Sequence, residues 1–412
     1  MLSTFAYNLF PIPYYLYPMN YRQLFLQHVA QTSPNPIGVE IVRASGVFLY
    51  DVSGKAYIDG ISGFSVANIG HSNPAVVKAV QEQAAAYMHT IVYGEFIEQP
   101  QVAYAKMLTD HLPASLNCVY FTGSGAEAAE GAMKLAKRIT QRSKMISAKN
   151  AYHGSTQGAL SVMGDEYYKQ AFRPLLPDTF QYAYNSQDLI DAIDSNTACV
   201  ILETVQAESG ITTPDKIWLQ AVRKKCDTHC VLLILDEIQA GFGRTGSLWA
   251  FEQMNIVPDI LLLGKALGGG MPLGAFIADK KLMVTLTHDP VLGHITTFGG
   301  HPVSCAAGKA AFEVLLQEKW IAEVKEKGLY LKNKLQHPAI LQINEAGLWI
   351  SLQFESGSIA QSIAHACVMN GLITDWFLFA TDRLRIAPPL CITYVELDEL
   401  IQKLLNSIIK NY

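Results

Sequence analysis

Short apolar runs alternate with amphipathic stretches through the middle of the chain. Six runs predict β-strands, at residues 119–121, 144–147, 199–202, 231–235, 260–263 and 274–278. Among and after these runs, apolar residues recur at helical spacing and predict helices over 126–138, 188–193, 217–226 and 303–316. Strands that alternate with helices in this way are typical of an α/β domain with a largely parallel sheet.

The two ends of the chain have a different pattern. From about residue 312 onward, long helical stretches alternate with short strands at 348–354 and 383–386, which predicts a smaller α+β domain. Within residues 37–59, the sequence GVFLYDVSGKAYID predicts a hairpin with Ser53-Gly54 at its turn, and we expect this hairpin to join the smaller domain. We therefore expect an N-terminal arm and part of the small domain in 1–60, a large domain in 61–311 and a C-terminal small domain in 312–412.

Composition excludes several classes of protein. Of the 412 residues, 50% are hydrophobic and only 16% are charged, so the chain is not an intrinsically disordered one. The net charge of −5 does not indicate a nucleic-acid-binding protein. No apolar run approaches the roughly 18 residues that a membrane span needs. The first 22 residues are aromatic and contain three prolines but no basic region, so we expect an irregular arm that packs on the body or on a partner subunit.

The seven cysteines are scattered, and no C-x-x-C pair occurs. This pattern predicts neither a disulfide framework nor a metal site, and it favours a reducing compartment such as the cytoplasm.

Several predicted strands run directly into polar or glycine-rich segments. The first is followed by Thr122-Gly123-Ser124-Gly125 and then a helix, and others are followed by Glu203, Asp236 and Gly264-Lys265. In open α/β sheets, ligands bind outside the carboxyl ends of the strands. We therefore expect an anion-binding turn, acids and a lysine to converge at one edge of the sheet.

Each of these features has more than one interpretation. The glycine turn fits either a phosphate at a helix N-terminus or an ordinary strand–helix connection. Asp236 and Glu237 could bind magnesium in a nucleotide hydrolase, but no G-x-x-x-x-G-K-[ST] sequence accompanies them, and G-x-G-x-x-G is absent at the turn. Lys265 could be a surface lysine or an enclosed amine that attacks an aldehyde. Together, the lysine, a strand-end aspartate for a protonated ring nitrogen and the glycine turn describe a pyridoxal phosphate site.

The chain resembles the class III (ω-amino) aminotransferases of fold type I, the pyridoxal 5′-phosphate-dependent group that includes ornithine, acetylornithine, putrescine and 4-aminobutyrate transaminases. The resemblance rests on stretches over most of the chain, among them YDVSGKAYIDGISGF, FTGSGAEAAEGAMKLAKR, ILETVQAESG, LLILDEIQAGFGRTG, PDILLLGKALGGG, TTFGGHPVSCAAG and LRIAPPL. It implies an α/β fold with a large domain, whose mainly parallel central sheet is flanked by helices, and a smaller α+β domain. It also implies a homodimer with active sites at the interface.

The resemblance assigns roles around the cofactor. Lys265 forms the Schiff base with pyridoxal phosphate and then moves the proton, and Asp236 pairs with the pyridine nitrogen. Gln239 contacts the phenolic oxygen and Tyr152 stacks on the ring. The remaining residues assigned to cofactor binding are Ser124, Gly125 and Ala126 at the phosphate, Thr297 at the phosphate of the neighbouring subunit, and His153 and Glu203.

Three residues are assigned to the substrate. By resemblance, Arg385 binds a carboxylate of the keto acid, and Glu208 pairs with Arg385 during the amine-donor half-reaction. Phe64 stands where ornithine transaminases typically carry a tyrosine, and in this respect the chain looks closer to putrescine-type relatives. Ser155 stands where many relatives have an arginine after the aromatic-His-Gly triplet. The sequence therefore does not name the donor.

The resulting hypothesis is a ping-pong aminotransferase. An ω-amino donor, of the ornithine, acetylornithine, diamine or ω-amino acid class, would pass its amino group to a keto acid such as 2-oxoglutarate or pyruvate. The alternatives are an aminomutase or other chemistry on the same cofactor, a non-catalytic homologue, and a nucleotide hydrolase.

Overall fold

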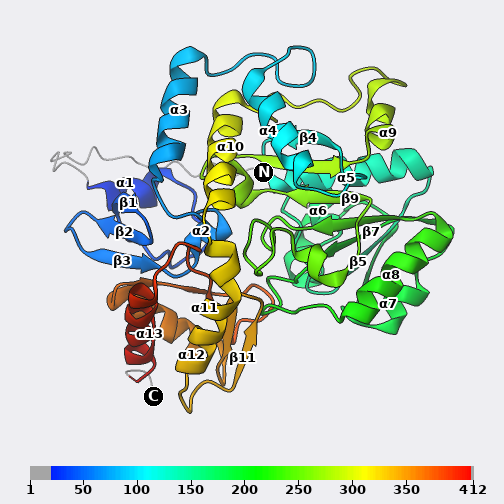
Figure 1. The fold of residues 1–412 in the computed structure, drawn as a ribbon. Helices are drawn as coiled ribbons and strands as arrows, with labels where there is room; N and C mark the ends of the chain where they lie inside the picture. The colour runs from blue at the N-terminus through cyan, green and yellow to red at the C-terminus, as the bar shows by residue number, and fades with distance from the viewer. Residues whose placement is uncertain (1–19, 410–412) are drawn as a thin grey trace, which may run out of the picture.

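The computed structural model describes residues 20–409 (Figure 1). The arm expected in the first 22 residues lies almost entirely outside this range. Its last two residues, Tyr21 and Arg22, begin helix α1 (Tyr21–His28), because Asn20 and Gln23 cap the helix with reciprocal side-chain-to-backbone hydrogen bonds of 2.9 and 3.1 Å.

A seven-stranded sheet forms the centre of the molecule. Its strand order is β4-β10-β9-β8-β7-β5-β6, and only β10 runs antiparallel to its neighbours. The strands are β4 (Cys118–Thr122), β5 (Lys144–Ala148), β6 (Thr179–Tyr182), β7 (Thr197–Glu203), β8 (Leu232–Asp236), β9 (Ile260–Leu263) and β10 (Gly274–Ala278). The six predicted strands and the largely parallel sheet are confirmed. The sequence did not predict β6, because this edge strand is incompletely buried and no apolar run marks it.

Helices cover both faces of this sheet (Figure 1). The predicted helices are confirmed with small shifts at their ends: α5 (Gly125–Thr140), α7 (Gln187–Asp191), α8 (Lys216–His229) and α10 (Pro302–Gln317). The buried face of α5 is made largely of alanines, which lets the helix lie close to β9 and β10. The other helical elements between residues 62 and 287 are α2 (Ser62–Ser65), α3 (Pro74–Ala86), α4 (Gln99–Asp110), α6 (Gln157–Ser161) and α9 (Lys280–Met283), with 3₁₀ turns η1 (Glu166–Tyr168), η2 (Gln170–Phe172), η3 (Ala250–Met254), η4 (Lys265–Gly268) and η5 (Val284–Thr287).

Two four-stranded sheets form the smaller part of the molecule. One has the order β1-β2-β3-β13 and the other β11-β12-β15-β14. Their strands are β1 (Ile41–Ser45), β2 (Phe48–Asp51), β3 (Ala56–Asp59), β11 (Gln342–Glu345), β12 (Ile350–Gln353), β13 (Leu372–Ile373), β14 (Asp375–Trp376) and β15 (Arg383–Ile386), and the helices with them are α11 (Trp320–Lys334), α12 (Gly357–Met369) and α13 (Tyr394–Ile409).

The hairpin near the start of the chain belongs with this smaller part. Strands β2 and β3 pair antiparallel around a turn in which Asp51 accepts the backbone N–H groups of Ser53 and Lys55. Strand β3 then pairs in parallel with β13, more than 300 residues later. The predicted boundary between 311 and 312 lies inside α10, and the domain limits stay a prediction.

A buried arginine connects the two parts of the molecule. Arg244 is fully buried and donates to the carbonyl oxygens of Leu348 and Pro388 and to the side chains of Ser62 and Asn68. Since these partners come from both ends of the chain, Arg244 holds the loop after β8 against the smaller part. Within residues 20–409, no helix is both long enough and apolar enough to cross a membrane.

Candidate active site

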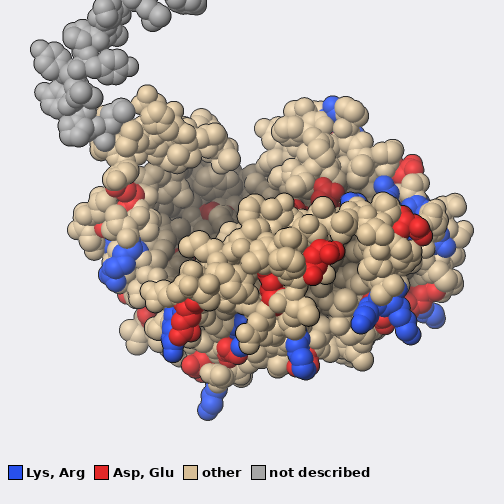
Figure 2. Space-filling model, turned by 90° about the horizontal axis from the view of Figure 1, so that it is seen from above, with Lys and Arg blue, Asp and Glu red and all other residues tan. Residues whose placement is uncertain are grey.

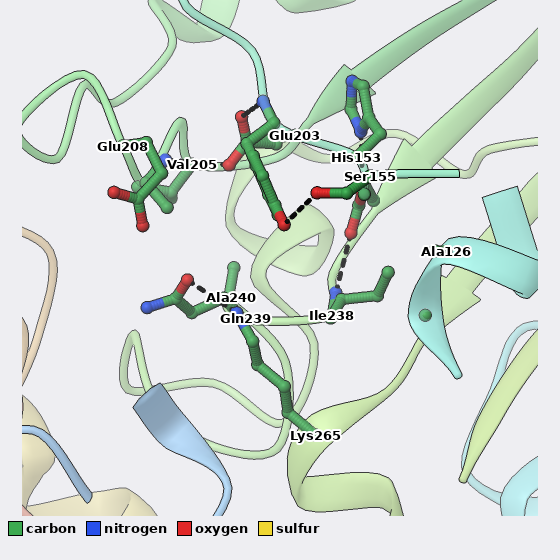
Figure 3. A pocket seen from close by; sticks show the side chains of 15 residues that line it. Ala126, His153, Ser155, Glu203, Val205, Glu208, Ile238, Gln239, Ala240 and Lys265 are labelled. Carbon is green, nitrogen blue, oxygen red and sulfur yellow. Dashed lines mark hydrogen bonds and ion pairs between the residues drawn. The ribbon is translucent and has the colours of Figure 1, made fainter. Parts of the chain in front are cut away.

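A cavity of about 240 Å³ lies at the carboxyl ends of the parallel strands. Nine residues that the sequence assigned to cofactor or substrate line it: Gly125, Ala126, Tyr152, His153, Glu203, Glu208, Asp236, Gln239 and Lys265. In the close-up of Figure 3, Ala126 lies at one end of the cavity and Glu208 at the other, with Lys265 between them. The predicted convergence of the strand ends is therefore present.

The register of the strands explains why the acids meet. Strands β7 and β8 run parallel, with Glu203 directly opposite Asp236 as the last residue of each strand. Both side chains are at least nine-tenths buried. Burial raises the pKa of Glu203 to about 7, an effect that the nearby His153 partly offsets.

Both carboxylate oxygens of Asp236 are engaged on the protein side. One accepts the backbone N–H of Ile238 at 2.9 Å, and the other lies 2.8 Å from Nδ1 of His153. The ring of His153 is buried, and its Nε2 has no hydrogen-bond partner in the described part of the chain. These contacts fix the orientation of the carboxylate that faces the cavity.

Lys265 begins 3₁₀ turn η4, directly after β9. Its backbone has φ of +50°, a left-handed conformation that is costly for a residue with a side chain and is found mainly at functional sites. Its Nζ donates to Oε1 of Gln239 at 2.9 Å, while the buried Nε2 of Gln239 has no partner among the described residues. Burial lowers the pKa of Lys265, and Glu208 partly offsets this effect, so the free amine is favoured relative to an exposed lysine.

The opposite end of the cavity is the N-terminus of α5. Ser124 caps this helix by accepting the N–H of Glu127 at 3.2 Å, whereas the N–H groups of Gly125 and Ala126 have no partner in the described chain. Ser124 itself is exposed and is not among the residues that line the cavity. Free N–H groups and the dipole of a 16-residue helix make this end suited to an anion.

The loop after β5 forms one wall of the cavity. The N–H groups of Tyr152 and Ala207 donate to the two oxygens of Glu203, at 3.0 and 2.9 Å. Gly154 adopts a φ of +131°, and a Cβ there would lie 2.6 Å from that of Ala126, so this loop approaches α5 only because residue 154 is a glycine. The hydroxyl groups of Tyr152 and Ser155 lie 3.2 Å apart.

The predicted substrate residues meet next to Glu208. Arg385 Nη2 donates to both oxygens of Glu208, at 2.8 and 2.9 Å, across 177 positions of sequence. The guanidinium carbon lies 4.5 Å from the ring centre of Phe377 and 5.2 Å from that of Phe64, which is 43% exposed. The structure thus brings Phe64, Glu208 and Arg385 together, with the guanidinium within cation–π distance of two aromatic rings.

Four of the predicted residues do not line this cavity: Phe64, Ser124, Arg385 and Thr297. Of these, Thr297 belongs to a different segment of the chain. It is exposed, on the segment between η5 and α10. This position agrees with a role in a neighbouring subunit, but a single chain does not test that role.

Sequence reasoning missed two contributors. Ile238 supplies the N–H that orients Asp236, and its side chain packs against Gly125. Asp375 on β14 lies 3.3 Å from Nε of Arg385. The sequence offered one signal for Asp375. It is the only charged residue in the mostly apolar segment LITDWF, and a charged residue within a buried strand is often functional.

Comparison with known proteins agrees with this geometry. The family model described as aminotransferase class-III matches residues 29–408. The chain belongs to the class III aminotransferase family. It is 35% identical over 381 residues to the acetylornithine aminotransferase of Caldanaerobacter subterraneus, covering 89% of this chain and 94% of that protein. It is 36% identical over 383 residues to ornithine aminotransferase 1 of Staphylococcus aureus, covering 89% and 93%.

Solved structures of other aminotransferases share the fold. The ornithine aminotransferase of Toxoplasma gondii, whose active site holds pyridoxal phosphate at partial occupancy, superimposes with a TM-score of 0.87 at 28% identity over 94% of this chain and 93% of that one. An (S)-enantioselective ω-transaminase from Thermomicrobium roseum gives 0.87 at 27% identity over 95% and 99%. This class III enzyme is therefore an aminotransferase that acts on small amino donors and keto acceptors, in a family that depends on pyridoxal phosphate.

Proposed function

We propose that this class III enzyme is a pyridoxal 5′-phosphate-dependent ω-aminotransferase and that the cofactor occupies the cavity at Lys265. The proposal rests on a set of hydrogen-bonding groups in the cavity. They have no hydrogen-bond partner in the described chain, and they are of the types that the cofactor's phosphate and phenolic oxygen would bind. The free N–H groups of Gly125 and Ala126 suit its phosphate, and the unpartnered Nε2 of Gln239 suits its phenolic oxygen. Asp236 presents a fixed carboxylate to a protonated ring nitrogen.

Each residue around the cavity would then have a separate role in the reaction. Pyridoxal phosphate, when bound, supplies an aldehyde that takes up the amine and an electron-poor ring that stabilises negative charge at the substrate carbon. The carboxylate of Asp236 keeps the ring nitrogen protonated, and the ring of Tyr152 provides a flat face for stacking. Nζ of Lys265, with its lowered pKa, takes and returns the proton of the reacting carbon.

The pair between Glu208 and Arg385 supports transfer between two substrates. When Glu208 is bonded to Arg385, the guanidinium is neutralised and an amine donor can enter. When Glu208 turns away, Arg385 can bind a carboxylate of a keto acid in a bidentate pair. We propose a ping-pong reaction with 2-oxoglutarate or pyruvate as acceptor. The named relatives act as ornithine and acetylornithine aminotransferases, which supports an ω-amino donor.

We also propose a homodimer whose two sites lie at the interface. Two neighbouring connections, α3–α4 and η5–α10, expose large apolar side chains: Met88, Phe96 and Ile97 in the first, and Val291, Ile295 and Phe298 in the second. Figure 2 views the molecule from the side on which these connections lie, and the surface around its hollow carries few charged residues. Exposed apolar surface of this extent is typical of an interface, and Thr297 lies within it.

Sedimentation should give about twice the 45.3 kDa of one chain, and Ile97→Asp should reduce this mass.

A spectroscopic experiment tests the cofactor. The purified protein with added pyridoxal phosphate should have a visible absorbance band that borohydride bleaches and fixes to Lys265, as mass spectrometry of the peptide would show. A donor amine should remove the band without borohydride, and a keto acid should restore it. A protein that stays colourless, or whose band no amine removes, would contradict the proposal.

A further inference from the structure

A second carboxylate lies beside Arg385, the partner of the cavity residue Glu208. Asp375 on β14 and Arg385 on β15 are directly opposite each other in an antiparallel pair, so their side chains lie on the same face of the sheet. Oδ1 of Asp375 and Nε of Arg385 are 3.3 Å apart, an ion pair at a nitrogen of the guanidinium that Glu208 does not contact. Neither atom has a hydrogen-bond partner in the described chain, so the contact is purely electrostatic.

The charges in this cluster do not balance. One cation, Arg385, faces two carboxylates, Glu208 and Asp375. The other ionisable groups that act on Asp375 add no cation: Asp59 on β3 is a further acid, and it is paired with His71 at 2.7 Å. Burial raises the pKa of Asp375 to about 7, and Arg385 partly offsets this effect. Above that pH, the group formed by Arg385, Glu208 and Asp375 has one more negative charge than positive, and it adjoins the cavity at Glu208.

We infer that Asp375 is a specificity-determining positioning residue, which holds Arg385 by its Nε edge and selects amino donors whose far end carries a positive charge. The inference rests on the proposed aminotransferase function. A diamine presents an ammonium group to Glu208, a group that the excess negative charge attracts. An ω-amino acid presents a carboxylate, which must compete with both acids for Arg385.

The absence of a basic residue at position 155 also favours a positively charged donor. In the described part of the chain, no arginine or lysine donates a hydrogen bond to Ser155, whose side-chain oxygen lies 3.2 Å from the hydroxyl of Tyr152. Among the described residues that line the cavity, Lys265 is the only lysine or arginine, and the ring of His153 is paired with Asp236. Since the donor reacts at Lys265, Arg385 is the remaining positive charge that a donor carboxylate could use, and two acids already neutralise it.

Three donors with nearly the same skeleton test the inference. 1,4-Diaminobutane has a far end of charge +1, ornithine of charge 0 and 4-aminobutyrate of charge −1. At pH 8.5 we expect kcat/KM to fall in that order, with about a tenfold difference at each step, as expected for one unit charge a few ångströms from a partly buried acid. Asp375→Asn should reduce the ratio of diaminobutane to 4-aminobutyrate by about tenfold or more.

Two comparisons distinguish an effect of the Asp375 charge on the donor ratio from a structural effect of the substitution. Asp382→Asn removes a carboxylate just before β15 that, among the described residues, accepts a side-chain hydrogen bond from Gln353, and it should keep the wild-type ratio. In the wild type, the ratio should rise as pH increases through about 7, and this rise should disappear in Asp375→Asn. A cofactor band and an unfolding temperature like those of the wild type would establish that the variant is folded.

The outcomes are distinct. An unchanged donor ratio in a folded Asp375→Asn enzyme, or a wild type that prefers 4-aminobutyrate, would overturn the role of Asp375 and leave the aminotransferase proposal intact. If none of several amines transfers its amino group to either keto acid, the proposed function itself fails.

Discussion

The two ends of the cavity are built in different ways. At the cofactor end, Asp236 and Lys265 follow neighbouring parallel strands, and Asp236 has a protein partner for each oxygen. At the substrate end, Arg385 comes from an antiparallel sheet of the smaller part, and its Nε and Nη1 have no hydrogen bond in the described chain. The carboxylate of Asp236 is therefore held in place before a ligand arrives, whereas Arg385 keeps two nitrogens that a substrate can bond.

This difference predicts how variants should behave. Changes at the cofactor end should lower the rate with every substrate. Changes at the substrate end should alter the choice between substrates. The first three variants below test this division, and the fourth tests how burial at the cofactor end affects stability.

The largest effect is expected for Lys265→Ala. It removes the amine that takes up the cofactor and carries the proton, so turnover should fall by about 10⁴-fold or more with every donor. The cofactor should still bind through the phosphate end of the cavity, without the absorbance of the lysine-bound form. Lys280→Ala, an exposed lysine at the start of α9, is the matched control and should keep normal turnover. Equal rates in the two variants would contradict the assigned role of Lys265.

Asp236→Asn should lower kcat by about 10³-fold and cofactor affinity much less. The neutral amide cannot keep a ring nitrogen protonated, and its NH₂ group would face either Ile238 N–H or His153. Steady-state kinetics and a cofactor titration give the two quantities. Asp259→Asn alters a carboxylate at the other end of the same strands, where it bonds to Arg223 and Leu233, and it should leave kcat unchanged. A larger loss of affinity than of kcat in Asp236→Asn would contradict the role.

Arg385→Ala should separate the two half-reactions. The variant leaves Glu208 and Asp375 without their cation, and kcat/KM for the keto acid should fall about 10²-fold, since a buried charge pair is broken. The rate of the first half-reaction with a diamine, measured from the loss of the cofactor's absorbance band, should change much less. Arg383→Ala, on the same strand but bonded to Gln342 and Gln353, is the control. Equal losses in both half-reactions would show that Arg385 does not distinguish substrates.

The smallest effect is expected for stability and concerns Glu203. Its pKa is about 7 in the folded protein and about 4.5 in an unfolded chain, so the folded state holds the proton more tightly. This group's contribution to the free energy of unfolding should therefore decrease as pH rises from about 4.5 to 7, by at most about 3 kcal/mol. Denaturant titrations at pH 5 and 8 should show this change in the wild type.

Glu203→Gln should remove that part of the pH dependence, because an amide does not titrate. The exposed Glu82 on α3 provides the control, and Glu82→Gln should keep the wild-type difference between the two pH values. If Glu203→Gln retains the full difference, the carboxyl is not the group responsible.

The sequence by itself determined the α/β architecture and most of the cofactor end. Apolar runs that stop at Glu203, Asp236 and Lys265 are local signals, and parallel strands bring their carboxyl ends to one edge whatever the details of packing. The glycine turn before α5 is local in the same sense, because a cap and a helix N-terminus involve only adjacent residues.

Only the tertiary structure decided which distant side chains meet. Glu208 reaches Arg385 across 177 positions, and His153 reaches Asp236 across 83. Asp375 lies on Arg385 because of the register of two short strands, and a shift of one residue would turn its side chain to the other face of the sheet. Such contacts depend on strand register and on the packing of the smaller part against the larger, which no local pattern of apolar and polar residues encodes.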